Sequence, residues 1–96
     1  MIARFTRFYL AAADEDRFRE VGMRFPPMLR EQLGCQSVVW VQAAGESSVF
    51  SKWANRENAE AVTIAVRDKA VSALQEASIV LAGGPETTIY EVVEAP

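Results

Sequence analysis

The sequence contains no histidine, and this is the most restrictive feature of its composition. Histidine is the commonest metal ligand in proteins, the usual haem ligand and the usual general base near neutral pH. Its absence argues against metal centres, histidine-ligated haem and histidine-based catalytic triads. Any chemistry must therefore depend on other side chains, and we expect no metal ion and no cofactor.

Cysteine and long apolar runs are also scarce. Cys35 is the single cysteine, so an internal disulfide is excluded and a reducing, cytoplasmic location is expected. Without a histidine to generate a thiolate, Cys35 is predicted to be a small buried residue and not a nucleophile. Arg4 and Arg7 interrupt the segment where a signal peptide would be apolar. No run approaches the roughly 20 apolar residues that a membrane span needs.

The charged residues give a net charge of −3, from 10 basic and 13 acidic side chains. The arginines of residues 17–30 alternate with acidic residues, which predicts a mixed solvated surface and no nucleic-acid partner. The 96 residues, of which 50% are hydrophobic, suffice for one modest core. We therefore predict a single domain over residues 1–96.

The first third of the chain has the pattern of a strand followed by a broken helix. Residues 2–11 alternate like a strand, and residues 14–33 carry an apolar stripe with the helical period. Pro26 and Pro27 interrupt that stripe, so we expect a break just before them. Gly34 is expected to end the helix.

Residues 34–53 are predicted to form a β-hairpin, because two β-branched and aromatic arms flank a turn at Gly45. Both sides of this hairpin are apolar. Strict alternation places Val38 and Trp40 on one side; the residues expected on the other side are Cys35, Val39 and Val41. Sheet faces of this kind must be covered, one by the chain's own helices and the other by a partner. Trp40 is expected in that second, dimeric core.

The last part of the chain predicts one long helix and one strand. Asn55 or Asn58 can cap the helix, whose apolar residues recur every three or four positions. We expect it to lie flat on a sheet and to end at residues 83–85, before a final strand over residues 87–93. The stripe consists of Ala59, Val62, Val66, Ala70, Leu74, Ala77 and Leu81.

This order of elements predicts an α+β, ferredoxin-like βαββαβ fold with a four-stranded antiparallel sheet. Both helices then cover one face of the sheet. The other face carries too many apolar side chains to remain in water, and such a surface is typical of association. We predict a homodimer in which two open sheet faces pack together.

The motif Gly34-Cys35-x-Ser37, with Trp53 shortly before Glu57-x-Ala59, resembles the antibiotic biosynthesis monooxygenase family of dimeric α/β-barrel proteins. The resemblance covers nearly the whole chain. It implies a barrel formed across the dimer and a small-molecule pocket between each sheet and its own helices. Characterised members include cofactor-independent oxygenases of phenols or quinols and haem-degrading enzymes.

Two departures from the family pattern affect this expectation. The helix after the tryptophan often carries a histidine in the family, whereas here that region reads Val62-Thr63-Ile64, which argues against haem degradation. The asparagine that family members tend to place in the pocket is replaced by Thr6 or Val49 at the positions we align. A mechanism that needs that amide is therefore not expected.

Three residues are the candidates for catalysis. Trp53 could stack on an aromatic substrate and hold an oxygen through its indole N–H, or it could be a core tryptophan. Arg4 and Arg7 lie on opposite faces of a strand, so only one can stabilise negative charge in a given pocket; the alternative is pairing with Glu91 or Glu94. Of the two we choose Arg4; Tyr90 is the third candidate, as a hydroxyl donor, unless it is merely a buried tyrosine.

The resemblance implies a cofactor-independent monooxygenase that acts on an aromatic phenol or quinol. One alternative is a non-catalytic dimeric module for small-molecule binding or stress response, because fold does not fix function. Another is a polyketide cyclase or isomerase. The residues expected to bind the aromatic ligand are Trp53, Thr6, Phe25, Val49 and Ser51.

Overall fold

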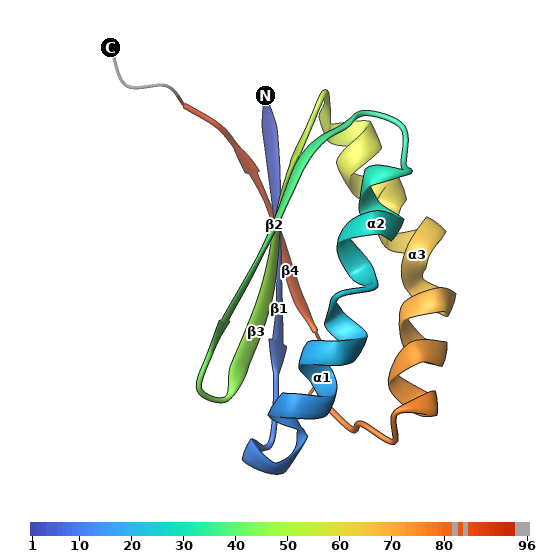
Figure 1. Ribbon diagram of the computed structural model, residues 1–96. Coiled ribbons are helices and arrows are strands. Elements are labelled where there is room, and N and C mark those ends of the chain that lie inside the picture. The colour runs from blue at the N-terminus through green and yellow to red at the C-terminus, as the bar shows by residue number, and fades with distance from the viewer. Residues whose placement is uncertain (82, 84, 94–96) are drawn as a thin grey trace.

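The computed structural model of the protein describes residues 1–81, 83 and 85–93, and its strands and helices follow the predicted order (Figure 1). The four strands form one antiparallel sheet in the order β2-β3-β1-β4. This arrangement confirms the α+β, ferredoxin-like fold. The elements are β1 Ile2–Tyr9, the 3-10 helix η1 Ala12–Asp14, α1 Glu15–Gly22, α2 Phe25–Arg30, β2 Cys35–Ala43, β3 Glu46–Trp53, α3 Arg56–Glu76 and β4 Glu86–Glu91.

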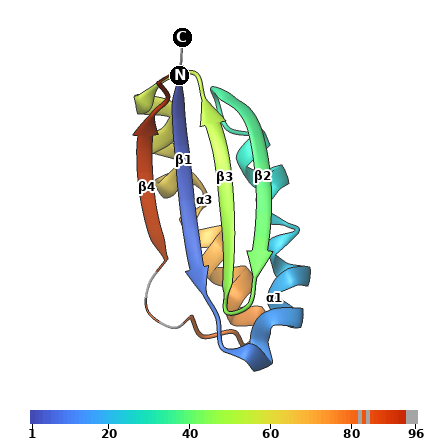
Figure 2. The same cartoon turned by 90° about the vertical axis from the view of Figure 1, so that its left-hand side faces the viewer.

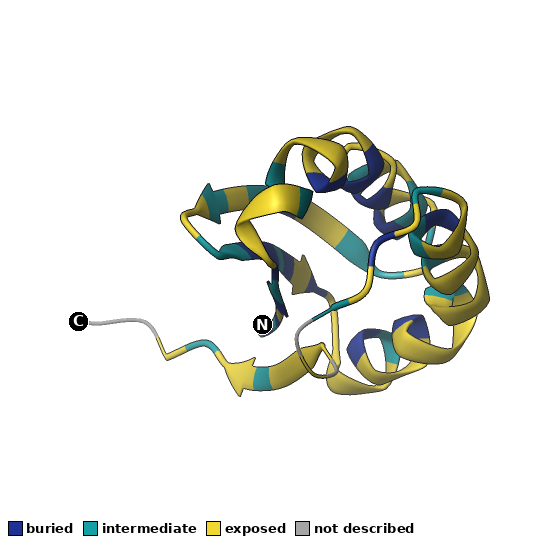
Figure 3. Ribbon diagram, turned by 90° about the horizontal axis from the view of Figure 1, so that it is seen from below, coloured by how far each residue is buried: buried dark blue, intermediate teal, exposed yellow. Residues whose placement is uncertain are grey.

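The molecule has two layers, with α1, α2 and α3 on one side of the sheet (Figure 1). Seen from the opposite side, the sheet lies in front and all three helices lie behind it (Figure 2). The buried positions of the helices lie on the sides that face the sheet (Figure 3). None of the helices in the described part of the chain is long and apolar enough to cross a membrane.

The predicted break in the first helix is confirmed. α1 ends at Gly22, and α2 begins at Phe25 with Pro26 and Pro27 in its first turn, where the missing N–H groups cost nothing. Gly34 then adopts a φ of +83°, and a side chain at this position would also collide with Asn58. Glycine is therefore required where the chain turns from α2 into β2.

The long helix begins as predicted and ends earlier. The side chain of Asn55 accepts a hydrogen bond from the Asn58 N–H (2.9 Å), which caps α3. The predicted stop at residues 83–85 is wrong, because α3 ends at Glu76 and Ser78 adopts a φ of +56°. The Ile79 N–H donates to the Leu74 carbonyl (3.0 Å) in a Schellman-type cap. Gly84, part of the predicted stop, lies outside the described residues.

The register of β2 corrects the assignment of two side chains to the faces of the sheet. The pairing shifts between Cys35 and Ser37, so Cys35 lies opposite Trp53 on the helix-covered face and not beside Val39. Trp40 also lies on the helix-covered face, where a Cβ on Gly22 would come within 2.7 Å of its ring. The prediction that Trp40 lies in a dimer core is therefore wrong. Its indole N–H donates instead to the Ser47 hydroxyl within the same subunit.

The open face of the sheet carries an apolar row across three strands. Val39 lies opposite Phe50, and Phe50 lies opposite Phe5, with the two phenylalanine rings edge to face at 5.9 Å. Val39 is 53% exposed, and Val41 and Tyr90 on the same face are also exposed. All three helices lie on the other side of the sheet (Figure 2).

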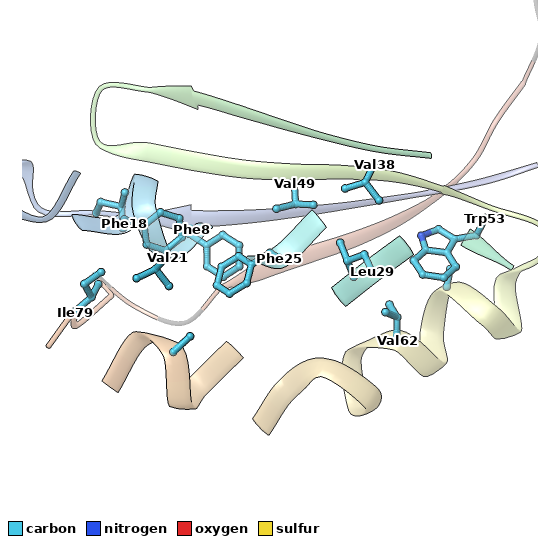
Figure 4. Packing of buried hydrophobic residues seen from close by; sticks show 13 residues of the cluster. Phe8, Phe18, Val21, Phe25, Leu29, Val38, Val49, Trp53, Val62 and Ile79 are labelled. Atoms are coloured by element: carbon cyan, nitrogen blue, oxygen red, sulfur yellow. The ribbon is translucent and has the colours of Figure 1, made fainter. Parts of the chain in front are cut away.

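The core between sheet and helices has its large aromatic side chains at its two ends (Figure 4). At one end Phe8, Phe18 and Phe25 form an aromatic cluster with ring centroids 5.4 to 6.0 Å apart. At the other end Trp53 is completely buried, near Val62 of α3. The middle of the layer, between these ends, is packed differently and contains the candidate site.

Candidate functional site

A cavity of about 400 Å³ lies between the sheet, α2 and α3. Its walls are mostly apolar, as in typical small-molecule sites, and five elements contribute to it. The lining residues are Arg4, Thr6 and Phe8 from β1, Phe25, Met28 and Leu29 from α2, Val49 from β3, six residues of α3 (Thr63, Val66, Arg67, Ala70, Val71 and Leu74), then Leu81, Pro85 and Thr87 at and before β4.

The apolar stripe of α3 explains why the middle of the layer is hollow. Val66, Ala70 and Leu74 point toward the sheet as predicted, yet they remain only partly buried. Val66 and Ala70 have short side chains, and the cavity lies between them and the strands, where β1 presents Arg4 and Thr6. The cavity therefore separates part of α3 from the sheet over this length.

Arg4 is the buried charge of the cavity. It is 6% exposed, and its guanidinium donates one hydrogen bond, from a terminal nitrogen to the Thr63 hydroxyl (2.9 Å). Its Nε is buried and has no hydrogen-bond partner among the described residues. Burial lowers the pKa of Arg4 below its ordinary value, because charge is less stable away from water.

The ion pairs of the described residues include none to Arg4, so the predicted alternative of a pair with Glu91 is not found. Glu94, the other predicted partner, lies outside the described residues. Arg7 points to the open face, 3.6 Å from the Glu46 carboxylate and 5.0 Å from the centre of the Phe5 ring. Arg4 is therefore the strand arginine that faces the cavity.

Three threonines supply the remaining hydroxyl groups of the cavity. Thr6 and Thr87 hydrogen-bond to each other across β1 and β4 (2.9 Å), and Thr63 holds Arg4. A second guanidinium, that of the exposed Arg67, completes the polar lining. In the described part of the chain the lining includes no aspartate, glutamate, tyrosine or cysteine.

Four of the predicted site residues meet at this cavity and three do not. Arg4, Thr6, Phe25 and Val49 line it. Trp53 is 0% exposed and lies outside the lining; its indole N–H donates to the Ser51 hydroxyl (2.8 Å). Trp53 thus occupies the core position that was its alternative, because its polar group is satisfied internally.

Ser51 and Tyr90 are also displaced from the expected pocket. The Ser51 hydroxyl donates to the Arg4 carbonyl (3.3 Å), so it supports the backbone behind Arg4 without reaching the cavity. Tyr90 lies on the open face, opposite Ala3, and is 47% exposed. Neither side chain can touch a ligand between the sheet and the helices of its own subunit.

Sequence reasoning missed Thr63, Arg67 and Thr87 as cavity residues. A signal for two of them exists, since Thr63 and Arg67 each follow a member of the apolar stripe by one position and are four residues apart. Such positions flank the buried side of a helix. Among the described residues no group of three or more potential metal-binding side chains comes together.

The sequence matches no protein-family model, and no curated protein matches it significantly. Solved structures match it over almost its whole length. A provisionally named antibiotic biosynthesis monooxygenase from Deinococcus radiodurans is 17% identical, with a TM-score of 0.77 over 100% of this chain and 96% of that one. A protein with the same provisional name from Nitrosomonas europaea is 13% identical, with a TM-score of 0.79 over 98% and 100% of the two chains.

A third solved structure is a mutant of SnoaB, a cofactor-independent oxygenase from Streptomyces nogalater. It is 12% identical, with a TM-score of 0.73 over 98% of this chain and 94% of that one. Likeness at such low identity establishes the arrangement of strands and helices and leaves the chemistry to the site itself. The chain therefore has the fold of the antibiotic biosynthesis monooxygenases.

Proposed function

We propose that the protein is a cofactor-independent monooxygenase whose cavity binds an aromatic phenol or quinol as its anion. The observation that carries this proposal is Arg4, a buried guanidinium with a free Nε in an apolar cavity. A buried charge is costly unless it is paired, and an ionised ligand oxygen would supply the missing partner. The fold shared with a cofactor-independent oxygenase supports the same function.

In the proposed reaction the ionised substrate itself reduces oxygen. One electron passes from the substrate anion to O2, the resulting radical and superoxide combine at a ring carbon to give a peroxide anion, and a proton from solvent converts it into a hydroperoxide. When that carbon bears a hydrogen, loss of water converts it into a carbonyl. One oxygen atom then ends in the product and the other in water, and the substrate carbon supplies all the electrons.

The chain's contribution is to stabilise the anion and to exclude water. The Arg4 guanidinium favours the deprotonated form of the substrate oxygen, while Phe8, Phe25 and Val49 supply apolar walls. No general base lies among the described lining residues, so the substrate proton is released to solvent as the anion binds.

The test of this proposal uses 2-naphthol, which absorbs differently when it is ionised. The protein should lower the pH at which naphthol ionises, because Arg4 stabilises the anion, and Arg4→Gln should abolish the shift. Arg19→Gln on the exposed side of α1 is the matched control and should behave like the wild type. Oxygen uptake with anthrone or a hydroquinone is then measured; a rate no higher than that of buffer would exclude the oxygenase.

A non-catalytic binding module is the second candidate, and the absence of an acid or base among the described lining residues favours it. It predicts the same naphthol shift without oxygen uptake. A polyketide cyclase or isomerase is less well supported, since such reactions need a group that transfers protons.

We also propose that the protein is a homodimer in which the open faces of two sheets pack together and close a barrel. The apolar row of Val39, Phe50 and Phe5 on the open face, in which Val39 is exposed and the two phenylalanines are half-buried, supports this assembly. Phe50→Lys should convert a dimer into a monomer in sedimentation experiments, and Ile64→Lys, an exposed position on α3, is the control. A wild type that sediments as a folded monomer at micromolar concentration would contradict the dimer. The single cysteine suits a cytoplasmic location.

A further inference from the structure

The charge of the cavity is opposite to that of the whole molecule. The chain carries a net charge of −3, whereas the described lining of the cavity includes two arginines and no acidic residue. Apolar walls of low dielectric strengthen the field of such charges inside a cleft. The charge of the cavity therefore favours anionic ligands, and two cations are more than a single phenolate needs.

Arg67 is available to such a ligand. It lines the cavity from α3, it is exposed, and no ion pair or side-chain hydrogen bond to it occurs among the described residues. The helix offers it no acidic neighbour one turn away: the residues three and four positions on either side are Thr63, Ile64, Ala70 and Val71. Arg67 thus has no partner on its own helix.

The two arginines reach the cavity from opposite layers, Arg4 from the sheet and Arg67 from α3. Arg4 is buried and is held by Thr63, while Arg67 follows Thr63 by one turn of α3, about 6 Å along the helix axis. Arg67 is also the more exposed of the two, which places it nearer to solvent. Val66 and Ala70, which precede and follow Arg67 on α3, make the lining beside it apolar.

We propose that the ligand carries two acidic groups, a phenol-type oxygen that ionises against Arg4 and a carboxylate that pairs with Arg67 at the mouth of the cavity. The planar guanidinium of Arg67 suits a carboxylate, which it can bind through two parallel hydrogen bonds. The substrate class is then an aromatic hydroxy acid. This inference rests on the proposed function, because it concerns the same cavity and the same anion at Arg4.

The experiment compares two ligands that differ by one carboxylate, 2-naphthol and 6-hydroxy-2-naphthoate, by calorimetric titration of the full chain at low salt. The wild type should bind the hydroxynaphthoate more tightly. Arg67→Gln should weaken hydroxynaphthoate about fivefold, the upper value for a solvent-exposed charge pair, and should leave naphthol unchanged. Because Arg67 is exposed, this substitution should leave the fold and thermal stability intact.

Lys69→Gln is the matched control, because it removes the same charge from the same exposed helix at a residue outside the cavity lining. It should bind both ligands like the wild type. This result would distinguish a direct ion pair between Arg67 and the ligand carboxylate from a general electrostatic effect of the positive charges on α3. Raising the salt concentration should reduce the preference of the wild type for hydroxynaphthoate.

The possible failures are distinguishable. If naphthol binds and ionises but the wild type does not prefer hydroxynaphthoate, or Arg67→Gln weakens both ligands equally, the carboxylate site is wrong and the proposed function stands. An equal loss in Lys69→Gln and Arg67→Gln would also overturn the pairing. If neither ligand binds the wild type, the proposed function itself fails, and the inference fails with it.

Discussion

The core between the sheet and the helices is packed differently at its two ends and in its middle. At the ends, aromatic residues such as Phe18 and Trp53 are fully buried. In the middle, Val66 and Ala70 of α3 face Arg4 across a cavity of about 400 Å³. The contrast indicates that buried aromatic residues at the ends hold the sheet and the helices together. The region between the ends contains a cavity with a buried arginine instead of densely packed side chains.

The hollow region is compatible with a stable fold because it lies between two filled ones. The three-phenylalanine cluster fixes α1 and α2 on β1, and Trp53 with Val62 fixes the start of α3. Dense packing at both ends therefore keeps the walls of the cavity apart at a defined separation. Substitutions in the two kinds of region should consequently have different effects on stability and binding.

The largest expected effect is that of Trp53→Ala. Truncation of a fully buried tryptophan removes apolar contacts and leaves a void, so the free energy of unfolding should fall by about 3 to 5 kcal/mol in urea denaturation. Val66→Ala, on the cavity wall, should cost about 1 kcal/mol or less because it borders existing empty space. Equal losses for the two variants would contradict the distinction between ends and middle.

The next effect compares two alanines on the same helix. Ala59 is 0% exposed, so Ala59→Leu should destabilise the protein by about 1 to 3 kcal/mol through overpacking. Ala70→Leu places the same side chain in the cavity and should leave stability unchanged or increased, while it displaces naphthol. Thermal unfolding and calorimetric titration measure the two effects, and an Ala70→Leu variant with normal naphthol binding would place the ligand elsewhere.

The charge in the middle should cost stability when no ligand is bound. Arg4→Met removes a buried guanidinium whose Nε lacks a described partner, so the unfolding free energy should rise by about 1 kcal/mol. Arg7→Met on the open face is the control and should bring no such gain, because Arg7 is exposed and lies beside Glu46. Destabilisation by Arg4→Met would mean that Arg4 has a structural role.

The smallest effect concerns Cys35, which lies opposite Trp53 at a filled end. Partial burial raises the pKa of the Cys35 thiol, although the contact with Ser37 and the positive charge of Arg30 oppose the shift. At pH 8 the thiolate fraction is then smaller than in a free cysteine, and alkylation by iodoacetamide should be a few-fold slower.

The same shift gives a dependence of stability on pH. Above the ordinary thiol pKa the folded protein keeps a proton that the unfolded chain has lost, so stability should fall slightly as pH rises through that range. Cys35→Ala should remove this slope in urea denaturation at increasing pH. A slope that persists in Cys35→Ala would assign the effect to another group.

The order of elements was predictable because periodicity and local signals agree along most of the chain. Pro26 and Pro27 mark the helix break, Gly34 marks the turn and Asn55 marks the start of α3. The end of α3 was not predictable from glycine, because Ser78 takes the left-handed conformation itself. A buried Ile79 and two capping hydrogen bonds compensate for that choice.

The site was predictable only in part. The family resemblance pointed to Thr6 and Val49, and alternation along β1 separated Arg4 from Arg7 without showing which of them faces the pocket; Arg4, Thr6 and Val49 all line the cavity. Trp53 and Trp40 were misplaced because pattern alone does not show where an indole N–H finds its acceptor, and each finds a serine hydroxyl within the subunit. The contribution of α3 was missed because a cavity depends on how far the helix stands from the sheet.

The register shift between Cys35 and Ser37 has a consequence for how this chain can change in length. Gln36 is the unpaired residue there, and the hairpin beyond it is aligned independently through its own turn at Gly45. Deletion of Gln36 would restore a regular ladder without exchanging the inner and outer side chains of β2. The junction between α2 and the sheet can therefore lose one residue without changing which side chains of β2 face the helices. Elsewhere in the strand, a one-residue change in register would exchange the two faces.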